Sequence, residues 1–375
     1  MTSALAETTN RARPRDDERS GWLDGIRGLA AVLVLVAHAS RLSVPESRRA
    51  AWTPLEALLG QAGVVLFFVL SGYLIGRMWV SDRPTPSLRS YAVRRALRIW
   101  PAYALAYLAT VLLLSPDDVR STAQWVLHLL LLHSWWPGEY VAVFPIGWTL
   151  GVEAMFYVVA PWLPRSARAL GLLWLASAAL GLVGGVLAPA ASDPSGWVGP
   201  LRYSLPPLLC LFCPGILVAM RPAWLDGLRQ RELLSLSIAA PALVLAVFLS
   251  RQEPVWLRDL HYQALAVAFG IALLHAVDRP PGAPWLLRPM ASLGVVSYGI
   301  YLWHNTLMNV LIHSGVRAPG GDWAAAAALL MVATLPVAAL SWVVVERPAL
   351  SLARRLTAGS PPLSPAAQPT GSETR

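Results

Sequence analysis

The sequence predicts an all-α, polytopic integral membrane protein with about ten transmembrane helices. Of its 375 residues, 56% are hydrophobic and only 14% are charged, whereas about 25% of the residues of an ordinary soluble domain are charged. Apolar runs close to the roughly 20 residues that a helix needs to cross a bilayer recur along the chain. All the basic residues are arginine, and most of them lie between these runs.

Ten apolar windows are predicted to span the membrane. In chain order they are 25–43, 60–80, 99–115, 145–163, 168–190, 204–220, 232–250, 260–277, 290–313 and 323–345. The residues before the first window are polar and arginine-rich, without a clear cleavage site, so that window is predicted to be a signal anchor. With ten spans and an inner amino terminus, most arginines fall on the cytoplasmic side, which predicts a plasma-membrane protein with both termini in the cytoplasm.

A shorter apolar piece at 122–135 leaves open an eleventh span. It is short for a transmembrane helix and is flanked by Trp125, Trp135 and Trp136. Tryptophans at the ends of a short apolar segment suit an interfacial or re-entrant element. The arginine distribution also favours ten spans.

The chain is predicted to hold one transmembrane domain, residues 21–356, between two disordered cytoplasmic tails, 1–20 and 357–375. Both tails are rich in proline, serine, threonine or charge and lack apolar periodicity. Membrane topology and anionic lipid account for the net charge of +9, so no nucleic-acid partner is expected. Cys210 and Cys213 lack further ligands at metal-binding spacing, which predicts packing residues and no metal site.

Three ionisable residues, Asp24, Arg27 and His38, lie in or beside the first span. Each such residue costs about 2.5 to 3.5 kcal/mol at the centre of a membrane helix, so it indicates a functional site. The step from Arg27 to His38 is about three helical turns, or roughly 16 Å, and returns to nearly the same face. One helix is therefore predicted to present a cation near one membrane surface and an imidazole near the other.

Two later spans also carry polar stripes. In 145–163, Thr149, Glu153 and Tyr157 recur every four residues and share one face, so Glu153 is expected to face protein or water. In 290–313 a stripe is formed by Ser297, Tyr301, His304 and Asn305, with Tyr298 about 100° away. Such faces are not expected to touch lipid.

The segment before the third span is the most basic part of the chain. Arg94, Arg95 and Arg98 precede Pro101 at the predicted inner surface, where guanidinium groups suit a phosphate-bearing ligand. In the second span, Ser71 has no nucleophile-elbow context. Gly72 and Gly76 are spaced as a small-residue helix contact, so packing is the favoured interpretation there.

These segments, in this order, resemble the membrane-bound acyltransferase-3 family, whose members move acyl groups, often acetyl, onto hydroxyls of glycans, lipids or secondary metabolites. The segments are LDGIRGLAAVLVLVAH, GVVLFFVLSGYLIG, RRALRIWPAY, WTLGVEAMFY, SYGIYLWH and the closing ERP, so the resemblance runs from about residue 22 to 355. It implies ten core helices, an acyl-CoA donor that enters from the cytoplasm, and an essential His38. The esterase-like domain that some members carry after the last helix is not expected here.

A division of labour follows from this resemblance. His38 is expected to act as general base on the acceptor hydroxyl, with Glu153 orienting its ring. Arg27 and one or more of the three arginines near the third span would hold the donor. The remaining pocket residues are expected to be Asp24, Ser71, Tyr157, Tyr298, Tyr301 and His304. No bound cofactor is expected, because acyl-CoA, in the first place acetyl-CoA, serves as co-substrate.

Two other functions fit a membrane protein with buried charges. A proton-coupled transporter of a small polar or sugar-like substrate is the main alternative, although the spans show no inverted repeat. A non-catalytic membrane subunit is less favoured, because it would not require Arg27, His38 and Glu153 in the membrane. For the enzyme, the open acceptors are a carbohydrate, a cell-envelope glycan, or a glycosylated or macrolide-type metabolite.

Overall fold

The structure, a computed structural model, describes residues 21–43, 53–80, 85–114, 121–139, 143–187, 198–251, 256, 260–277, 279 and 288–359. These residues form helices, turns and connecting segments, and no strand occurs among them. The protein is therefore all-α, as predicted. The predicted tails lie outside the described residues, apart from 357–359.

Six stretches of helix in the described part of the chain are long and apolar enough to cross a membrane. They are α1 (Gly21–Ser43), α2 (Thr53–Trp79), α3 (Leu88–Leu114), α6 (Ala167–Leu187), α11 (Glu232–Leu249) and the run of α16 (Trp323–Ser341), η8 (Trp342–Glu346) and α17 (Arg347–Thr357). They coincide with six of the ten predicted windows, so the predicted count of about ten is not confirmed.

The other four windows hold shorter or interrupted helices. These are α5 (Gly147–Val159), α8 (Leu205–Leu208), α9 (Cys213–Met220), α13 (His261–Ala276), α14 (Arg288–Val295) and α15 (Ser297–His313). The short α7 (Val198–Tyr203) lies just before the window 204–220. Pro206, Pro207 and Pro214 each lack the backbone N–H of a helix interior, which explains why 204–220 is broken into short pieces. Window 290–313 is interrupted at Val296, between α14 and α15.

The apolar piece at 122–135 does not form a continuous helix. α4 (Thr122–Leu129) has eight residues, or about 12 Å of helix. The chain then turns at Leu131, whose φ is 61°, into the short η2 (His133–Trp135). A helix of this length does not cross a bilayer, which agrees with the interfacial or re-entrant interpretation.

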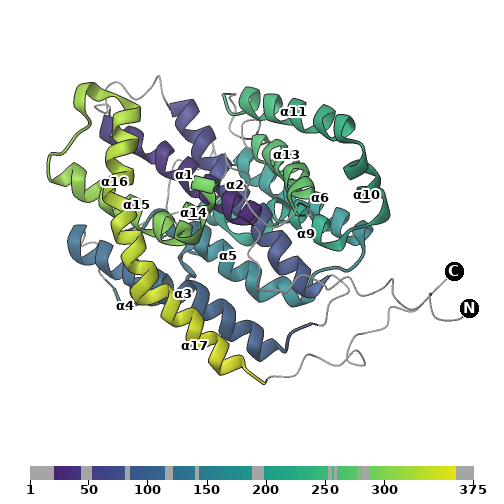
Figure 1. The fold of residues 1–375 in the computed structure, drawn as a ribbon, viewed down its shortest axis with the longest axis horizontal. Coiled ribbons are helices and arrows are strands. Elements are labelled where there is room, and N and C mark those ends of the chain that lie inside the picture. The colour runs from purple at the N-terminus through teal and green to yellow at the C-terminus, as the bar shows by residue number, and fades with distance from the viewer. Residues whose placement is uncertain are drawn as a thin grey trace, which may run out of the picture.

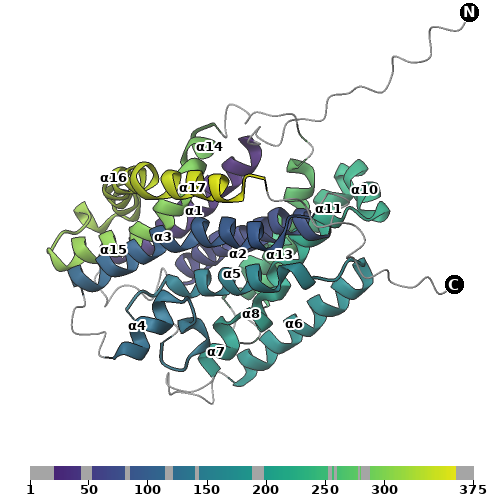
Figure 2. The ribbon, with the colours of Figure 1, turned by 90° about the horizontal axis from the view of Figure 1, so that it is seen from below.

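Figure 1 shows α1 and α2 at the centre, with α15 and α16 on one side and α6, α9, α11 and α13 on the other. α1 packs against α2, α14, α15 and α16, and α2 packs against α9 and α13. α17 lies along α3, as Figure 2 shows from below. The candidate site residues of α1 therefore lie in the middle of the helix array.

Glycines allow the closest helix contacts. A Cβ atom on Gly72 would overlap the carbonyl oxygen of Phe212, just before α9, and one on Gly215 of α9 would overlap the carbonyl oxygen of Val69. α2 and α9 are thus packed backbone to backbone, which confirms the packing interpretation of Gly72.

The outer helices carry apolar side chains on their exposed faces. Examples are Leu172, Leu175 and Val186 on α6 and Leu233, Leu236, Val244 and Phe248 on α11. Only about a fifth of the most apolar window of either helix is buried inside the protein. A lipid environment accounts for such faces, so the protein is a multi-pass membrane protein.

Candidate active site

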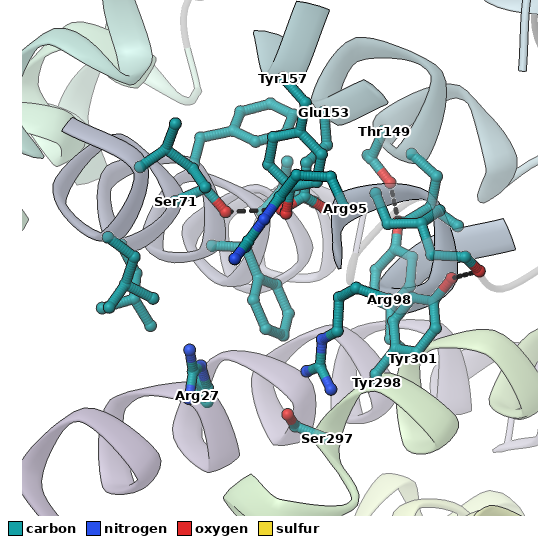
Figure 3. A pocket seen from close by; sticks show the side chains of 18 residues that line it. Arg27, Ser71, Arg95, Arg98, Thr149, Glu153, Tyr157, Ser297, Tyr298 and Tyr301 are labelled. Atoms are coloured by element: carbon teal, nitrogen blue, oxygen red, sulfur yellow. Dashed lines mark hydrogen bonds between the residues drawn. The ribbon is translucent and has the colours of Figure 1, made fainter. Parts of the chain in front are cut away.

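A first cavity, of about 110 Å³, is lined by residues of α1, α2, α3, α5 and α15. We call it the arginine cavity. Its polar lining consists of Arg27, Ser71, Arg95, Arg98, Thr149, Glu153, Tyr157, Ser297, Tyr298 and Tyr301. Figure 3 shows the side chains of the three arginines directed into the same space. The structure thus brings together residues from four of the predicted polar segments.

The arginines of this cavity differ in their partners. Arg27 forms an ion pair with Asp24, one turn earlier on α1, at 3.1 Å. In the described part of the chain, Arg95 and Arg98 form no ion pair with a carboxylate, and the Nε of Arg95 is buried without a hydrogen-bond partner. Buried donors of this kind suit an anionic ligand.

Aromatic rings hold the two unpaired guanidinium groups in place. The Arg95 guanidinium carbon lies 5.5 Å from the centre of the Tyr157 ring, and that of Arg98 lies 5.6 Å from the Tyr298 ring. The Tyr298 hydroxyl donates to the carbonyl oxygen of Ile99 at 2.7 Å, which fixes this ring against α3. Contacts between cations and aromatic faces orient guanidinium groups without neutralising their charge.

Arg94 lies outside the arginine cavity. Its side chain is exposed, and its Nε donates to the hydroxyl of Thr357 on α17 at 2.9 Å. On the helix Arg94 lies only about 40° from Arg98, so its contact with α17, and not its position around α3, directs its side chain away from the cavity. The structure therefore selects two of the three arginines predicted near the third span.

Glu153 faces two hydroxyl groups. Its Oε1 accepts hydrogen bonds from Ser71 at 2.6 Å and from Tyr157 at 2.7 Å (Figure 3). None of the contacts of Glu153 or His38 joins these two residues, which line different cavities. The predicted orienting role of Glu153 toward His38 thus stays a prediction.

A second cavity, of about 400 Å³, contains His38. We call it the histidine cavity. Besides His38, it is lined by Val34, Ala37, Ser40, Arg41, Glu56, Ala57, Gly60, Gln61, Val64, Pro145, Ile146, Trp148, Tyr203, Tyr262 and Tyr301. Most of the residues that line this cavity were not predicted as site residues from the sequence. Glu56 and Gln61 were detectable as polar residues in the otherwise apolar α2, whereas nothing in the sequence singles out Tyr203 or Tyr262.

The imidazole of His38 has a defined orientation. Its Nδ1 lies 2.9 Å from the carbonyl oxygen of Val34, one turn earlier on α1. A carbonyl oxygen only accepts, so in the neutral ring the hydrogen lies on Nδ1 and Nε2 carries the free electron pair. On its other side the ring contacts His304 of α15, with ring centres 5.0 Å apart.

The two cavities adjoin. Val64 and Tyr301 line both of them, from α2 and α15. Arg27 and His38 mark the two cavities along α1, and their separation in sequence corresponds to roughly 16 Å of helix. The cavity that contains the arginines and the cavity that contains His38 are thus neighbours that share the side chains of Val64 and Tyr301.

The cysteines take no part in either arrangement. Cys210 and Cys213 are free and buried, and their thiols donate to the carbonyl oxygens of Pro207 and Leu209. These contacts confirm the prediction that they are packing residues.

Comparison with known proteins decides the family. A family model described as an acyltransferase domain, of the acyltransferase-3 type, matches residues 20–343. The chain belongs to the acyltransferase-3 family. The match covers all the helices that line the two cavities, so this membrane protein is an acyltransferase.

Three proteins with similar sequences carry different names and are covered to different extents by the match. The chain is 28% identical to nodulation protein 10 of Rhizobium leguminosarum bv. viciae, over 92% of this chain and 98% of the relative. It is 31% identical to the exopolysaccharide production protein ExoZ of Rhizobium meliloti (strain 1021), over 80% of this chain and 93% of the relative. It is 28% identical to a putative peptidoglycan O-acetyltransferase, YrhL, of Bacillus subtilis (strain 168), over 87% of this chain and 54% of the relative. No solved structure matches the chain significantly.

Proposed function

We propose that this acyltransferase is a plasma-membrane O-acyltransferase that moves an acyl group, in the first place acetyl, from acyl-CoA to a hydroxyl group of a carbohydrate acceptor. The observation that carries the proposal is the pair of adjoining cavities, one with three arginines and the other with His38. A group transfer between two substrates requires that their reacting atoms lie close together, so the two binding sites must adjoin. Here Val64 and Tyr301 line both cavities, and the reacting atoms would meet beside them.

The donor is assigned to the arginine cavity. Arg95 and Arg98 offer guanidinium donors without carboxylate partners, which suits the phosphates of CoA. A space of about 110 Å³ is smaller than a usual site for a whole drug-sized ligand. The diphosphate would lie against Arg95 and Arg98, the narrow pantetheine arm would extend through the cavity, and the adenosine part would stay at the cytoplasmic entrance. The thioester end then points toward Tyr301.

The acceptor is assigned to the histidine cavity. At about 400 Å³, this space falls within the range of small-molecule sites. Its wall combines the aromatic rings of Trp148, Tyr203 and Tyr262 with the polar side chains of Glu56 and Gln61. Such a mixture fits one or two sugar units of a cell-envelope glycan or a glycosylated metabolite. The name of the ExoZ relative, an exopolysaccharide production protein, favours the same class.

His38 is assigned as the general base of a direct transfer. Its Nε2 takes the proton of the acceptor hydroxyl while the hydroxyl oxygen attacks the thioester carbonyl carbon. The carbon–oxygen bond forms, the carbon–sulfur bond breaks, and the CoA thiolate leaves. The proton on His38 then passes to that thiolate, so the products are the acyl ester and free CoA.

Acetyl-CoA binding and slow acetyl-CoA hydrolysis by the purified protein in detergent test this proposal. Arg27→Ala should weaken binding about tenfold or more. His38→Ala should retain binding and lower turnover by about 10²-fold to 10⁴-fold, the usual contribution of a general base. Retained turnover in His38→Ala overturns the base assignment. Substrate uptake into vesicles without acyl-CoA, together with no acetyl-CoA binding, would support the transporter instead.

A further inference from the structure

His304 lies directly behind the proposed base. It comes from α15, which packs against α1, and its side chain is completely buried. The ring centres of His38 and His304 are 5.0 Å apart, and the ring planes are inclined at 58°. His38 lines the histidine cavity, whereas His304 lines neither cavity. His304 therefore contacts the base from the protein side and is shielded from both substrates.

The hydrogen bonds of His304 define its free nitrogen. Its Nδ1 lies 3.2 Å from the carbonyl oxygen of Ile300, one turn earlier on α15. The hydrogen of the neutral ring therefore lies on Nδ1. The Nε2 atom is buried and has no hydrogen-bond partner in the described part of the chain. A buried acceptor without a partner costs stability.

We propose that His304 is a positioning residue for His38: it holds the plane of the His38 ring and stabilises the imidazolium that forms when His38 accepts the acceptor's proton. This inference rests on the proposed function, because an imidazolium forms only if His38 is the base. The carbonyl oxygen of Val34 accepts from Nδ1 of His38, as the carboxylate does in a catalytic triad, so His304 acts through the contact between the two rings.

The surroundings of His38 favour this role for His304. No hydrogen bond or ion pair joins the imidazole of His38 to a carboxylate within the described ranges. The charged groups that share its cavity are Arg41 on α1 and Glu56 on α2, and Glu153 is engaged with two hydroxyls in the other cavity. Among these neighbours, the His304 ring is the one in direct contact with the base.

Two variants separate an electronic role of His304 from simple packing. His304→Phe keeps a ring of similar size but has no electron pair to offer. His304→Gln has a side-chain oxygen that accepts hydrogen bonds near the position of Nε2. His313→Phe is the matched control, because His313 lies on the same helix and makes the same Nδ1 contact, with Asn309 at 2.8 Å, but is exposed.

The measurement is kcat and KM for acetyl-CoA turnover by the purified full-length protein. We expect His304→Phe to lower kcat about tenfold or more without changing KM, since His304 does not line the arginine cavity. His304→Gln should recover a substantial part of that loss, and His313→Phe should match the wild type. This pattern supports an electronic contribution that a purely structural residue would not make.

Several results would overturn the assignment. Wild-type kcat in His304→Phe, equal losses in both His304 variants, or a change in KM alone would each show that the free electron pair plays no part. Failure of both variants to bind acetyl-CoA would make His304 a structural residue. An active wild type with an unaffected His304→Phe refutes this inference alone, whereas a folded wild type without turnover refutes the proposed function as well.

Discussion

The hydroxyl groups of Thr149 and Tyr301 lie 2.6 Å apart and join α5 to α15 at the boundary between the two cavities. Both hydroxyls also lie within hydrogen-bond distance of the carbonyl oxygen of Ile146, at 3.0 and 3.1 Å. Each hydroxyl has one hydrogen, so one donates to the carbonyl while the other donates to its neighbour. The Tyr301 ring, which packs edge-on against Phe67, is thereby fixed where the two cavities adjoin.

A double-mutant cycle with Thr149→Val and Tyr301→Phe measures this link. Each single variant removes one of the two buried hydroxyls and therefore the hydrogen bond between them. The second substitution then cannot remove that hydrogen bond again. Interhelical hydrogen bonds in membrane proteins show coupling energies of about 0.6 kcal/mol on average, so we expect non-additive losses of that order. The measurement is the free energy of unfolding in detergent micelles. Strictly additive losses would show that the two hydroxyls act independently.

Replacement of Glu153 by Gln distinguishes two roles for this residue. The amide oxygen of Gln still accepts hydrogen bonds from Ser71 and Tyr157, so the variant changes mainly the charge. One negative charge fewer beside three arginines favours an anionic donor, so we expect acetyl-CoA to bind about threefold tighter or more. Isothermal titration in detergent measures this change. Unchanged affinity together with a large loss of kcat would instead support the predicted orientation of His38 by Glu153.

The helical class of the fold follows from the sequence, but the lengths of several helices do not. Long apolar runs without internal breaks, such as those of α1 and α6, became single helices. The window 204–220 is also rich in apolar residues but contains prolines that break it into three short pieces. Window 290–313 breaks at Val296, two residues after Gly294, whose backbone lies against the carbonyl oxygen of Asp24 on α1, so a single glycine and tertiary packing accompany a break that the apolar pattern does not show.

The arginine cavity was largely predictable, because its polar residues recur at helical spacing within apolar spans. Thr149, Glu153 and Tyr157 share a face in the sequence and all line this cavity. The separation of Glu153 from His38 was not predictable, since the depth of two residues in a membrane does not fix their lateral distance. The same limit applies to Tyr203 and Tyr262, which reach the histidine cavity from helices that carry no catalytic signal.

The neighbouring arginines of α3 provide an internal comparison of donor binding. Arg95→Ala and Arg98→Ala remove guanidinium groups from the cavity, and each should weaken acetyl-CoA binding about tenfold, equivalent to about 1.4 kcal/mol. Arg94→Ala removes an exposed group that contacts Thr357, so its effect on affinity should stay within about twofold. The dissociation constants, measured at one fixed ionic strength, test this difference. Equal weakening by all three would indicate a diffuse electrostatic effect, without a defined phosphate site.

The contact between α2 and α9 predicts the stability of a glycine variant. In Gly72→Ala the new methyl group overlaps the carbonyl oxygen of Phe212, so the two backbones must separate. Overpacking of this kind costs about 1 to 3 kcal/mol, which lowers the melting temperature in detergent. Gly171→Ala on α6 is the matched control: its added Cβ meets no atom within 4 Å, and the higher helix propensity of alanine stabilises it by up to about 1 kcal/mol. If Gly72→Ala melts at the wild-type temperature, the helices have room to move apart, and the position of Ser71 beside Glu153 does not depend on this contact.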